Sequence, residues 1–216
     1  MSGAGVSIRR PRVGILAVQG AISEHEEALA AVGAEPRQVR RPEEMDGLSG
    51  LVIPGGESTT FGLVAERSGL LAAVRRAVAG GLPTLGTCAG LIMLARATVG
   101  GAQPLVGGMD LVVRRNAFGR QRASFEATLA VPAIGEDPVH GVFIRAPWIE
   151  SAGPGVELLA HHDGHGVAAR QGALLATAFH PELAGERRFH AWLVERARER
   201  GDEREHREEG ARVRAQ

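Results

Sequence analysis

One segment of the chain combines a nucleophile with the backbone that would present it. The only cysteine, Cys88, lies in the segment 86–90 (Gly-Thr-Cys-Ala-Gly), between the apolar runs 82–85 and 91–95. This order predicts a strand, a tight glycine-flanked turn and a helix. Glycines permit a strained turn, and the first amides of a helix stabilise a thiolate. The pattern indicates a cysteine nucleophile, whereas an isolated cysteine without this setting is more often a small buried apolar residue.

A base and a carboxylate stand far downstream of this cysteine. His180 and Glu182 follow the apolar run 176–179 and flank Pro181. In an extended segment, residues two apart point to the same side, so Glu182 could bind one imidazole nitrogen while the other faces Cys88. That bond would fix the tautomer and stabilise the imidazolium. The alternative is a surface histidine beside a solvated carboxylate, but together the three residues predict a Cys-His-Glu triad that attacks an acyl carbon.

Attack on an amide also requires donors for the developing oxyanion and groups that bind the substrate. The amide of Ala89 and those of Gly55 and Gly56 are candidate donors, although Pro-Gly-Gly alone is also a plain turn. The charges of Arg115 and Glu57 suit the carboxylate and the ammonium of a small zwitterionic substrate.

The elements that must position these residues follow from the alternation of apolar strands and amphipathic helices. We expect strands near 13–18, 51–53 and 82–85, a further one starting at Val39, and helices over 22–32, 59–66 and 70–79. Such alternation predicts a parallel sheet covered on both faces, whose ligands gather at the carboxyl ends of the strands. Gln19, Gly55 and Cys88 each follow a predicted strand, so we expect them to meet there.

The second half has a different pattern. Short strands separated by Gly, Pro and Asp predict antiparallel or mixed pairing, with a hairpin turning near Gly172. The expected strands cover 109–113, 127–131, 141–144, 156–160, 167–172 and 174–178. A closing helix is expected over 187–200, burying Phe189, Trp192 and Leu193. Residues 201–216 are charged and nearly free of large apolar side chains, which predicts a disordered tail.

Composition excludes several functional classes. Acidic and basic residues number 25 each, which favours neither nucleic acid nor a membrane surface as partner. All the basic residues are arginine, so no lysine Schiff base can form. One cysteine forms no internal disulfide, and no apolar run approaches the roughly 20 residues of a membrane helix, so we expect a cytoplasmic protein. Three histidines (His161, His162 and His165) are interpreted as a loop without a metal, and the others, including His25 and His190, as surface or helix-face residues.

Six short segments share one family pattern. They are "GILAVQGAISEH" at 14–25, "PGGEST" at 54–59, "GTCAGLIMLA" at 86–95, "RNAFGRQ" at 115–121, "FIRAP" at 143–147 and "FHPEL" at 179–183. Across residues 13 to about 195 the chain resembles the triad-type (class I) glutamine amidotransferases, and among them the glutaminase subunits of pyridoxal 5′-phosphate synthase. "RNAFGRQ" and the first segment are typical of that narrower family. The chain departs from it at Ala184-Gly185 and in the tail, neither of which touches the triad.

The resemblance implies an α/β, three-layer, flavodoxin-like fold with a central mostly parallel sheet and a mixed or antiparallel second half, as one domain over residues 1–200. Cys88 would be the nucleophile, His180 the base and Glu182 its orienting acid. Three further residues, Gln19, Gly55 and Ala89, would form the oxyanion and activation region. The pocket for glutamine would be lined by Gly56, Glu57, Ser58, Arg115, Ile144 and Arg145.

The resemblance also implies partners. L-Glutamine would be the substrate, with no cofactor of the chain's own. The ammonia would pass to a separate, barrel-shaped pyridoxal 5′-phosphate synthase subunit within a large hetero-oligomeric complex. Because an isolated glutaminase would waste glutamine, we expect weak activity until that subunit docks and orders the loop around Gly55 and Gln19.

Two other functions stay open from the residues alone. The first is another cysteine-nucleophile hydrolase of similar layout, such as a peptidase or esterase; the joint presence of "RNAFGRQ" and "PGGEST" argues against it. The second is a regulatory subunit without catalytic activity; the intact Cys88, His180 and Glu182 argue against that.

Overall fold

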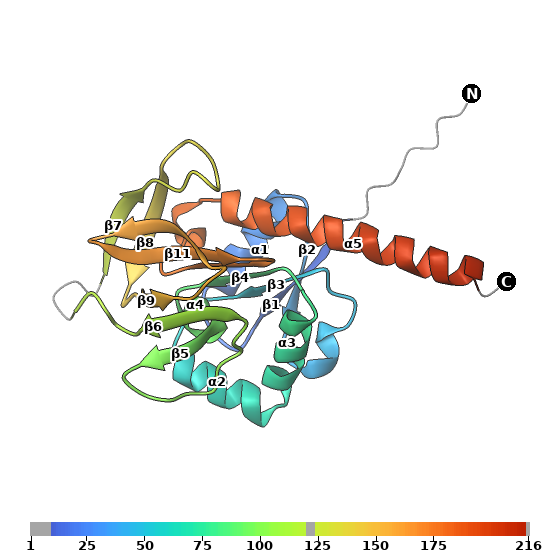
Figure 1. The fold of residues 1–216 in the computed structure, drawn as a ribbon, viewed down its shortest axis with the longest axis horizontal. Coiled ribbons are helices and arrows are strands. Elements are labelled where there is room, and N and C mark those ends of the chain that lie inside the picture. Colours follow the sequence, from blue (N-terminus) through green and yellow to red (C-terminus); the bar gives the residue numbers. More distant parts are fainter. Residues whose placement is uncertain (1–9, 120–123, 215–216) are drawn as a thin grey trace.

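The computed structural model describes residues 10–119 and 124–214, with the backbone alone for 203–214. Arg120 and Gln121 of the "RNAFGRQ" segment lie outside the described residues. A ten-stranded sheet forms the centre of the molecule, in the order β2-β1-β3-β4-β12-β11-β9-β6-β5, with β10 paired to β11. A separate two-stranded sheet contains β7 and β8. Figure 1 shows the large sheet between helices, with β7 and β8 at one end.

Half of the large sheet is parallel. Its strands are β2 (Glu35–Val39), β1 (Arg12–Leu16), β3 (Gly50–Ile53), β4 (Thr84–Thr87) and β12 (Leu174–Thr177). Each pairs in parallel with its neighbours in this list. β3, β4 and β12 are buried along their whole length, because helices cover both faces, and their sequences are correspondingly almost free of charge. The predicted parallel sheet is confirmed, although β2 ends at Val39 rather than starting there.

The other half is mixed. It contains β11 (His165–Gln171), β10 (Glu157–His162), β9 (Trp148–Ala152), β6 (Met109–Arg114) and β5 (Ala95–Val99), with β5 and β6 parallel and the remaining pairs antiparallel. The smaller sheet pairs β7 (Ser124–Leu129) with β8 (Val139–Ile144). The predicted hairpin is confirmed as the antiparallel pair of β11 and β12. Sequence analysis missed β5 and β9, because both are half-exposed and carry no apolar run.

Helices complete the layers. The helices are α1 (Ile22–Ala31), α2 (Ser58–Arg67), α3 (Leu70–Ala79), α4 (Ala89–Leu94) and α5 (Arg188–Arg214), with 3₁₀ turns η1 (Pro42–Met45) and η3 (Glu182–Ala184). α1 and α5 lie on one face of the sheet and α2 and α3 on the other (Figure 1). Phe189 and Leu193 of α5 are fully buried, as predicted, and Trp192 is partly buried. Within the described part of the chain, no helix is both long and apolar enough to span a membrane.

Two sequence-based expectations about the chain's polar segments differ from the structure. Residues 201–214 were expected to be a disordered tail, yet α5 continues to Arg214 and extends beyond the body in Figure 1. The segment is rich in Glu and Arg, which have a high helix propensity. His161, His162 and His165 were expected in a loop, but they lie in β10 and β11 around a tight Asp163-Gly164 turn in which both residues have positive φ.

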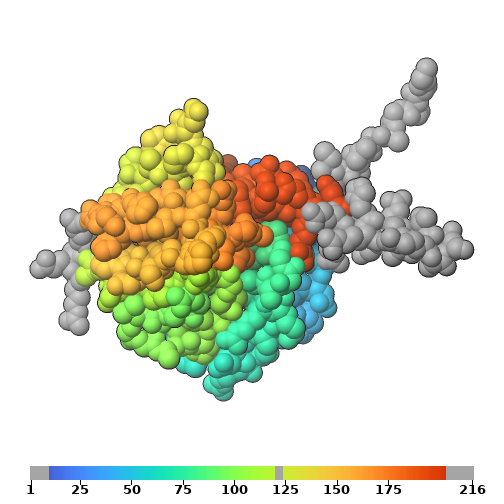
Figure 2. All heavy atoms as spheres, viewed as in Figure 1, coloured from blue at the N-terminus to red at the C-terminus, as the bar shows by residue number. Residues whose placement is uncertain are grey.

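The loop between β7 and β8 forms a separate projection. Figure 2 shows it rising from the body in yellow, above the band of strands that follows it in the sequence. The paired strands beneath it, in contrast, pack their aromatic side chains into the molecule: the rings of Phe125 and Phe143 stack with centroids 4.5 Å apart. Phe143 also contacts Phe179, with ring centroids 5.4 Å apart, and Arg188 of α5 donates to the loop carbonyls of Asp137 and Pro138, so both the strands and the loop contact the body.

Candidate active site

Four adjacent parallel strands deliver the predicted catalytic residues to one edge of the sheet. β1, β3, β4 and β12 are neighbours, and Gln19, Gly55, Cys88 and His180 each follow the carboxyl end of one of them. Contacts tie these loops together: a Cβ added to Gly55 would lie 2.2 Å from Cε1 of His180. The prediction that these loops meet at the carboxyl ends of the strands is confirmed.

Cys88 occupies the turn between β4 and α4. Its backbone has φ 51° and ψ −101°, an unusual conformation for a residue other than glycine, and its amide donates to the carbonyl of Thr177 (2.8 Å). Gly90 lets α4 approach β3, because a Cβ there would lie 2.0 Å from the carbonyl oxygen of Ile53. Cys88 is 6% exposed, and its Sγ lies 3.8 Å from the carbonyl oxygen of Ile144. The turn therefore holds a nearly buried thiol directly before a helix.

His180 and Glu182 are joined as predicted, but by a different backbone. The Nδ1 atom of His180 lies 2.7 Å from Oε1 of Glu182. The segment is not extended, since Pro181 has helical dihedrals and begins the turn η3, which carries Glu182 back toward the imidazole. The prediction of an extended His-Pro-Glu segment is therefore wrong, while the hydrogen bond that it was meant to explain is present.

The electrostatics of this group favour an imidazolium. Burial alone would lower the pKa of His180, but hydrogen bonds and charge interactions with Cys88 and Glu182 outweigh burial and raise it to about 10. Burial likewise would raise the pKa of Glu182, yet its hydrogen bond with His180 and the charges of His25 and His180 leave it lowered. At neutral pH the arrangement is therefore a buried carboxylate beside a protonated base that faces the sulfur.

The loop after β3 is held against the first loop. The Gln19 side chain donates from Nε2 to the carbonyl of Glu57 (2.6 Å). Gly56 has φ 144°, and a Cβ there would lie 3.1 Å from the Gln19 side chain. Gly20 fits as closely, because a Cβ there would lie 2.1 Å from the carbonyl oxygen of Gly55. The conformation of the Gly55-Gly56 loop thus depends on Gln19 and on the absence of side chains at three glycines.

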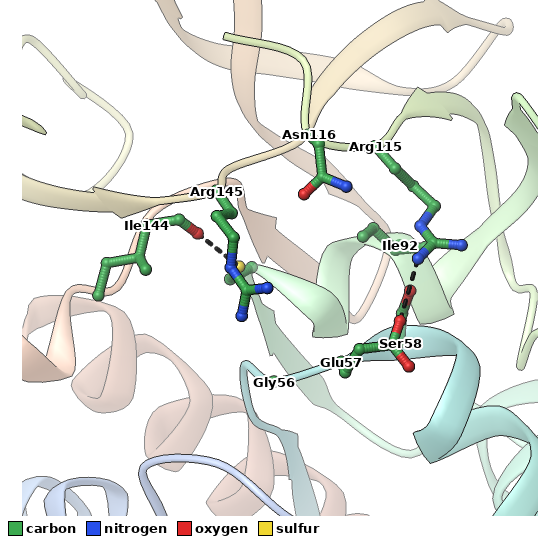
Figure 3. A pocket seen from close by; sticks show the side chains of 9 residues that line it. Gly56, Glu57, Ser58, Ile92, Arg115, Asn116, Ile144 and Arg145 are labelled. Atoms are coloured by element: carbon green, nitrogen blue, oxygen red, sulfur yellow. Dashed lines mark hydrogen bonds and ion pairs between the residues drawn. The ribbon is translucent and has the colours of Figure 1, made fainter. Parts of the chain in front are cut away.

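A cavity of about 150 Å³ opens beside the cysteine. Figure 3 shows its side chains coming from two directions, with Glu57 and Ser58 at the start of α2 and Arg115, Asn116, Ile144 and Arg145 in the facing loops. All six residues predicted to bind substrate line this cavity together with Cys88, and the structure adds Ile92 and Asn116. The lining residues are Gly56, Glu57, Ser58, Cys88, Ile92, Arg115, Asn116, Ile144 and Arg145.

Arg115 is fixed before any substrate arrives. Its Nη2 lies 3.0 Å from Oε1 of Glu57, and its Nη1 lies 2.9 Å from both Thr59 Oγ1 and Gln103 Oε1. Glu57 in turn caps α2 by accepting from the amides of Thr59 (3.1 Å) and Thr60 (2.7 Å). Burial would raise the pKa of Glu57, but these hydrogen bonds dominate and lower it to about 2. The cavity therefore presents an oriented pair of opposite charges, which suits a zwitterionic amino acid.

Backbone strain concentrates at this cavity. Of the four residues other than glycine with positive φ in the described chain, three line it: Cys88 (51°), Asn116 (46°) and Arg145 (45°). Such conformations cost on the order of 1–3 kcal/mol each and persist where the surroundings impose them. Their grouping supports a functional role for the cavity and singles out Asn116, which sequence analysis did not select.

Sequence analysis also missed two buried histidines behind the triad. His25 and His190 were interpreted as surface or helix-face residues; they lie on α1 and α5 but are fully buried, and Nδ1 of His25 lies 2.9 Å from Nε2 of His190. A signal was present: residues 22, 25, 29 and 32 follow helical spacing, so His25 shares the apolar stripe of its helix. The remaining member of the predicted site, Ala89, is buried at the first position of α4.

Comparison with known proteins gives one consistent family. The sequence profile of the SNO glutamine amidotransferase family matches residues 15–199. A protein of Streptomyces avermitilis named pyridoxal 5′-phosphate synthase subunit PdxT is 55% identical over 190 residues, covering 87% of this chain and 94% of that protein. A protein of the same name from Frankia casuarinae is 56% identical over 193 residues, covering 88% and 97%.

Solved structures agree. A crystal structure described as a glutamine amidotransferase superposes with a TM-score of 0.81 at 48% identity, covering 86% of this chain and 98% of that one. A glutamine amidotransferase from Thermotoga maritima superposes with a TM-score of 0.58 at 14% identity, covering 88% and 99%, which supports the fold alone.

Proposed function

The chain belongs to the SNO glutamine amidotransferase family, and from this membership we infer that it is the glutaminase subunit of a pyridoxal 5′-phosphate synthase. It hydrolyses L-glutamine to L-glutamate and ammonia, and it supplies the ammonia for pyridoxal 5′-phosphate synthesis. The observation that supports the chemistry best is that Cys88 lines a polar cavity while His180 interacts with Cys88 and is hydrogen-bonded to Glu182.

In the proposed mechanism Cys88 attacks the side-chain amide carbon of glutamine. The carbon–sulfur bond forms as the carbonyl π electrons move to oxygen, and the resulting oxyanion is stabilised by backbone amides around Gly55 and Ala89. The His180 imidazolium then gives a proton to the departing nitrogen, so that ammonia leaves and a glutamyl thioester remains. Neutral His180 next takes a proton from water as the water attacks the thioester, which releases glutamate and restores the thiolate and the imidazolium.

Recognition of the α-amino acid end falls to the charged wall of the cavity. Arg115 has the charge and fork geometry to bind the substrate carboxylate, and Glu57 has the charge to bind its ammonium. Ile144 and Arg145 line the cavity from the same direction as Arg115 and opposite Glu57, with the Ile144 carbonyl next to the sulfur. The cavity has a volume of about 150 Å³, which suits a free amino acid.

The partner is a synthase subunit that consumes the ammonia. We further propose that this partner is barrel-shaped, that many copies of both chains form a large hetero-oligomer in the cytoplasm, and that docking orders the Gly55 loop. The Gln19 side chain supports the last proposal, because it holds the carbonyl of Glu57 and would transmit a change in the first loop to the oxyanion region.

The test is ammonia release from glutamine with and without the synthase subunit. We expect wild-type activity to rise when the synthase subunit is added. Cys88→Ala should release ammonia at least about 10³-fold more slowly with the subunit present, as should His180→Ala, and the double variant should be no slower than either, because the residues act as one unit. Equal rates for wild type and Cys88→Ala would refute the mechanism, and equal rates with and without the subunit would refute the proposed activation.

A parallel screen with simple esters and peptides tests the alternative of a general cysteine hydrolase.

A further inference from the structure

Two buried histidines extend the triad into the core. The Nε2 atom of His25 lies 3.4 Å from Oε1 of Glu182 and 3.3 Å from Oγ1 of Thr87, the residue before the nucleophile. On the other side of the ring, Nδ1 of His25 lies 2.9 Å from Nε2 of His190. Both histidines are fully buried, and they come from helices at opposite ends of the sequence. A continuous row of side chains therefore runs from Cys88 through His180, Glu182 and His25 to His190.

The burial of two imidazole rings, those of His25 and His190, in the core is unusual. Burying a polar ring costs free energy that an apolar side chain of similar volume would not cost, so a buried polar pair without function is unfavourable. Neither ring lines the substrate cavity. Within the described residues, the one carboxylate within 4 Å of either ring is that of Glu182, which is itself fully buried as a side chain. This contact is where the histidine pair can affect the reaction.

The protonation of the pair follows from burial and from its neighbours. Burial lowers the pKa of His25 below its usual value and, with the charge of His25, lowers that of His190 to about 3, so both rings are neutral at pH 7. Each ring then carries one N–H. A carboxylate oxygen only accepts hydrogen bonds, so the His25 nitrogen that faces Glu182 is best satisfied when it carries the proton.

That choice fixes the rest of the row. With the proton of His25 on Nε2, its Nδ1 accepts a hydrogen bond from Nε2–H of His190, and Nδ1 of His190 is an unprotonated acceptor. Nδ1 of His190 is a buried atom that has no hydrogen-bond partner of good geometry, and the backbone carbonyl of Glu186 beside the ring acts to raise the pKa of His190. The contact that decides between the tautomers is therefore the one with Glu182, because the opposite tautomers would aim a lone pair of His25 at the lone pairs of a buried carboxylate.

We propose that His25 is a positioning residue of the glutaminase reaction: its Nε2–H donates to Glu182 and holds that carboxylate against His180, while His190 sets the tautomer of His25. The proposal rests on the proposed function for its kinetic consequences. His25 touches neither substrate nor sulfur, so it acts through Glu182 alone.

Removing the donor has a specific expected effect. Glu182 would keep His180 as its partner but lose the second group that fixes its orientation, and its Oε2 already has no partner. The imidazole would then be less well oriented for both proton transfers, which slows turnover. Substrate binding would not change, because the charged wall of the cavity is built by other elements.

The kinetic test compares two substitutions at one position, assayed with the synthase subunit present. His25→Gln keeps an N–H donor near the Nε2 position, whereas His25→Met has similar length and no donor. We expect His25→Met to lower kcat by about 10- to 100-fold, the range for one hydrogen bond to a charged group, with an unchanged KM. His25→Gln should stay within about threefold of wild type.

The pH profile separates positioning from packing. In His25→Met the acidic limb of kcat/KM should move to higher pH, because the carboxylate has lost a donor that favours its ionised form. The groups that face His25 and contribute to this titration are Glu24 of its own helix, Thr87, His180, Glu182 and His190. A lower melting temperature with an unshifted pH profile and equal kcat in both variants would show a purely structural role and overturn the proposal.

A second measurement does not depend on the reaction or on any substitution. The ¹⁵N chemical shifts of the wild-type histidines report which ring nitrogen carries the proton. We expect Nε2–H on His25 and Nε2–H on His190, and Nδ1–H on His25 would overturn the proposal. If these tautomers are found in a chain that releases no ammonia from glutamine, the proposed function fails while the assigned hydrogen bond stands.

Discussion

The two walls of the cavity are built in different ways. One wall carries Cys88, with His180 and Glu182 behind it; it lies on the ends of buried parallel strands, and each of these residues is at most 7% exposed. The opposite wall consists of turns that follow β6 and β8, where Ile144 is 37% exposed and Arg145 is exposed. The groups proposed to transfer protons are thus fixed by the core, whereas Arg115, Ile144 and Arg145, proposed to bind the substrate, lie on turns that solvent can reach.

The difference has a physical reason. Proton transfer requires placement within a few tenths of an ångström in a site of low dielectric, which a close-packed core provides. Recognition of a charged amino acid requires groups that can exchange water for substrate, which an exposed turn provides. Strain follows the same division, since Asn116 and Arg145 with positive φ lie on the turns, while Cys88 is the single strained residue of the buried wall.

Among substitutions that keep every side chain of the proposed triad, the largest effect is expected from one that disturbs the buried wall. In Gly55→Ala the new Cβ would lie 2.2 Å from Cε1 of His180, so the imidazole must move. We expect kcat for glutamine to fall by about a hundredfold, as for a displacement of roughly 1 Å, with the fold retained. Gly201→Ala is the matched control, because a Cβ there meets nothing within 4 Å. Unchanged kcat in Gly55→Ala would contradict the tight placement of the base.

A smaller effect, on a different constant, is expected on the exposed wall. Arg115→Ala removes the proposed partner of the substrate carboxylate and should raise KM by about 10- to 100-fold with little change in kcat, as expected for one hydrogen bond to a charged group. Arg114→Ala is the control, because Arg114 pairs with Glu150 at the surface, Nε to Oε2 2.9 Å, and does not line the cavity. If Arg115→Ala lost as much kcat as Gly55→Ala, the two walls would not have the separate roles in binding and in proton transfer that we propose.

The smallest effect concerns the titration of Glu57. Its pKa in the folded protein is about 2, below the usual 4.5, so its stabilising interactions are fully present above pH 4.5 and are lost as the pH falls toward 2. Hydrogen bonds from Thr60 and Thr59 cause the lowering, so Thr60→Val should raise this pKa by less than one unit, because the main-chain bonds remain. A ¹³C titration of the Glu57 carboxyl group measures both values. A midpoint near 4.5 in wild type would show that the cap of α2 does not form in solution.

The sequence predicted which residues form the buried wall, but it did not predict the backbone that brings them together. The positions of Gln19, Gly55 and Cys88 followed from strands that end in glycine-rich turns, because the carboxyl ends of neighbouring parallel strands share one edge. The His180–Glu182 hydrogen bond was predicted from an extended backbone that does not exist. The burial of His25 and His190 was not predicted, because hydropathy treats histidine as polar and the two rings that contact each other are 165 residues apart in the sequence.

Most residues of the exposed wall were predicted from the resemblance to the glutamine amidotransferase family, and fewer from the physical properties of the sequence. Arg115 and Glu57 were selected from charge, but the turns that carry Asn116 and Arg145 have positive φ without glycine, and no local pattern indicates that. The long continuation of α5 was also missed, because low hydropathy was interpreted as disorder although Glu and Arg favour a helix. Local composition therefore predicted the buried strands, but not the half-exposed β5 and β9 or the polar residues that the fold buries.

The small sheet has a direct connection to the base. The backbone amide of His180 donates to the carbonyl of Val142 in β8 (2.8 Å), which makes the proposed catalytic histidine a one-residue extension of the β7–β8 hairpin. The amide proton of His180 is consequently shielded from solvent only while β8 stays in place. Its rate of exchange with deuterated water therefore reports how often the hairpin separates from the body, at the residue that we propose transfers protons in the reaction.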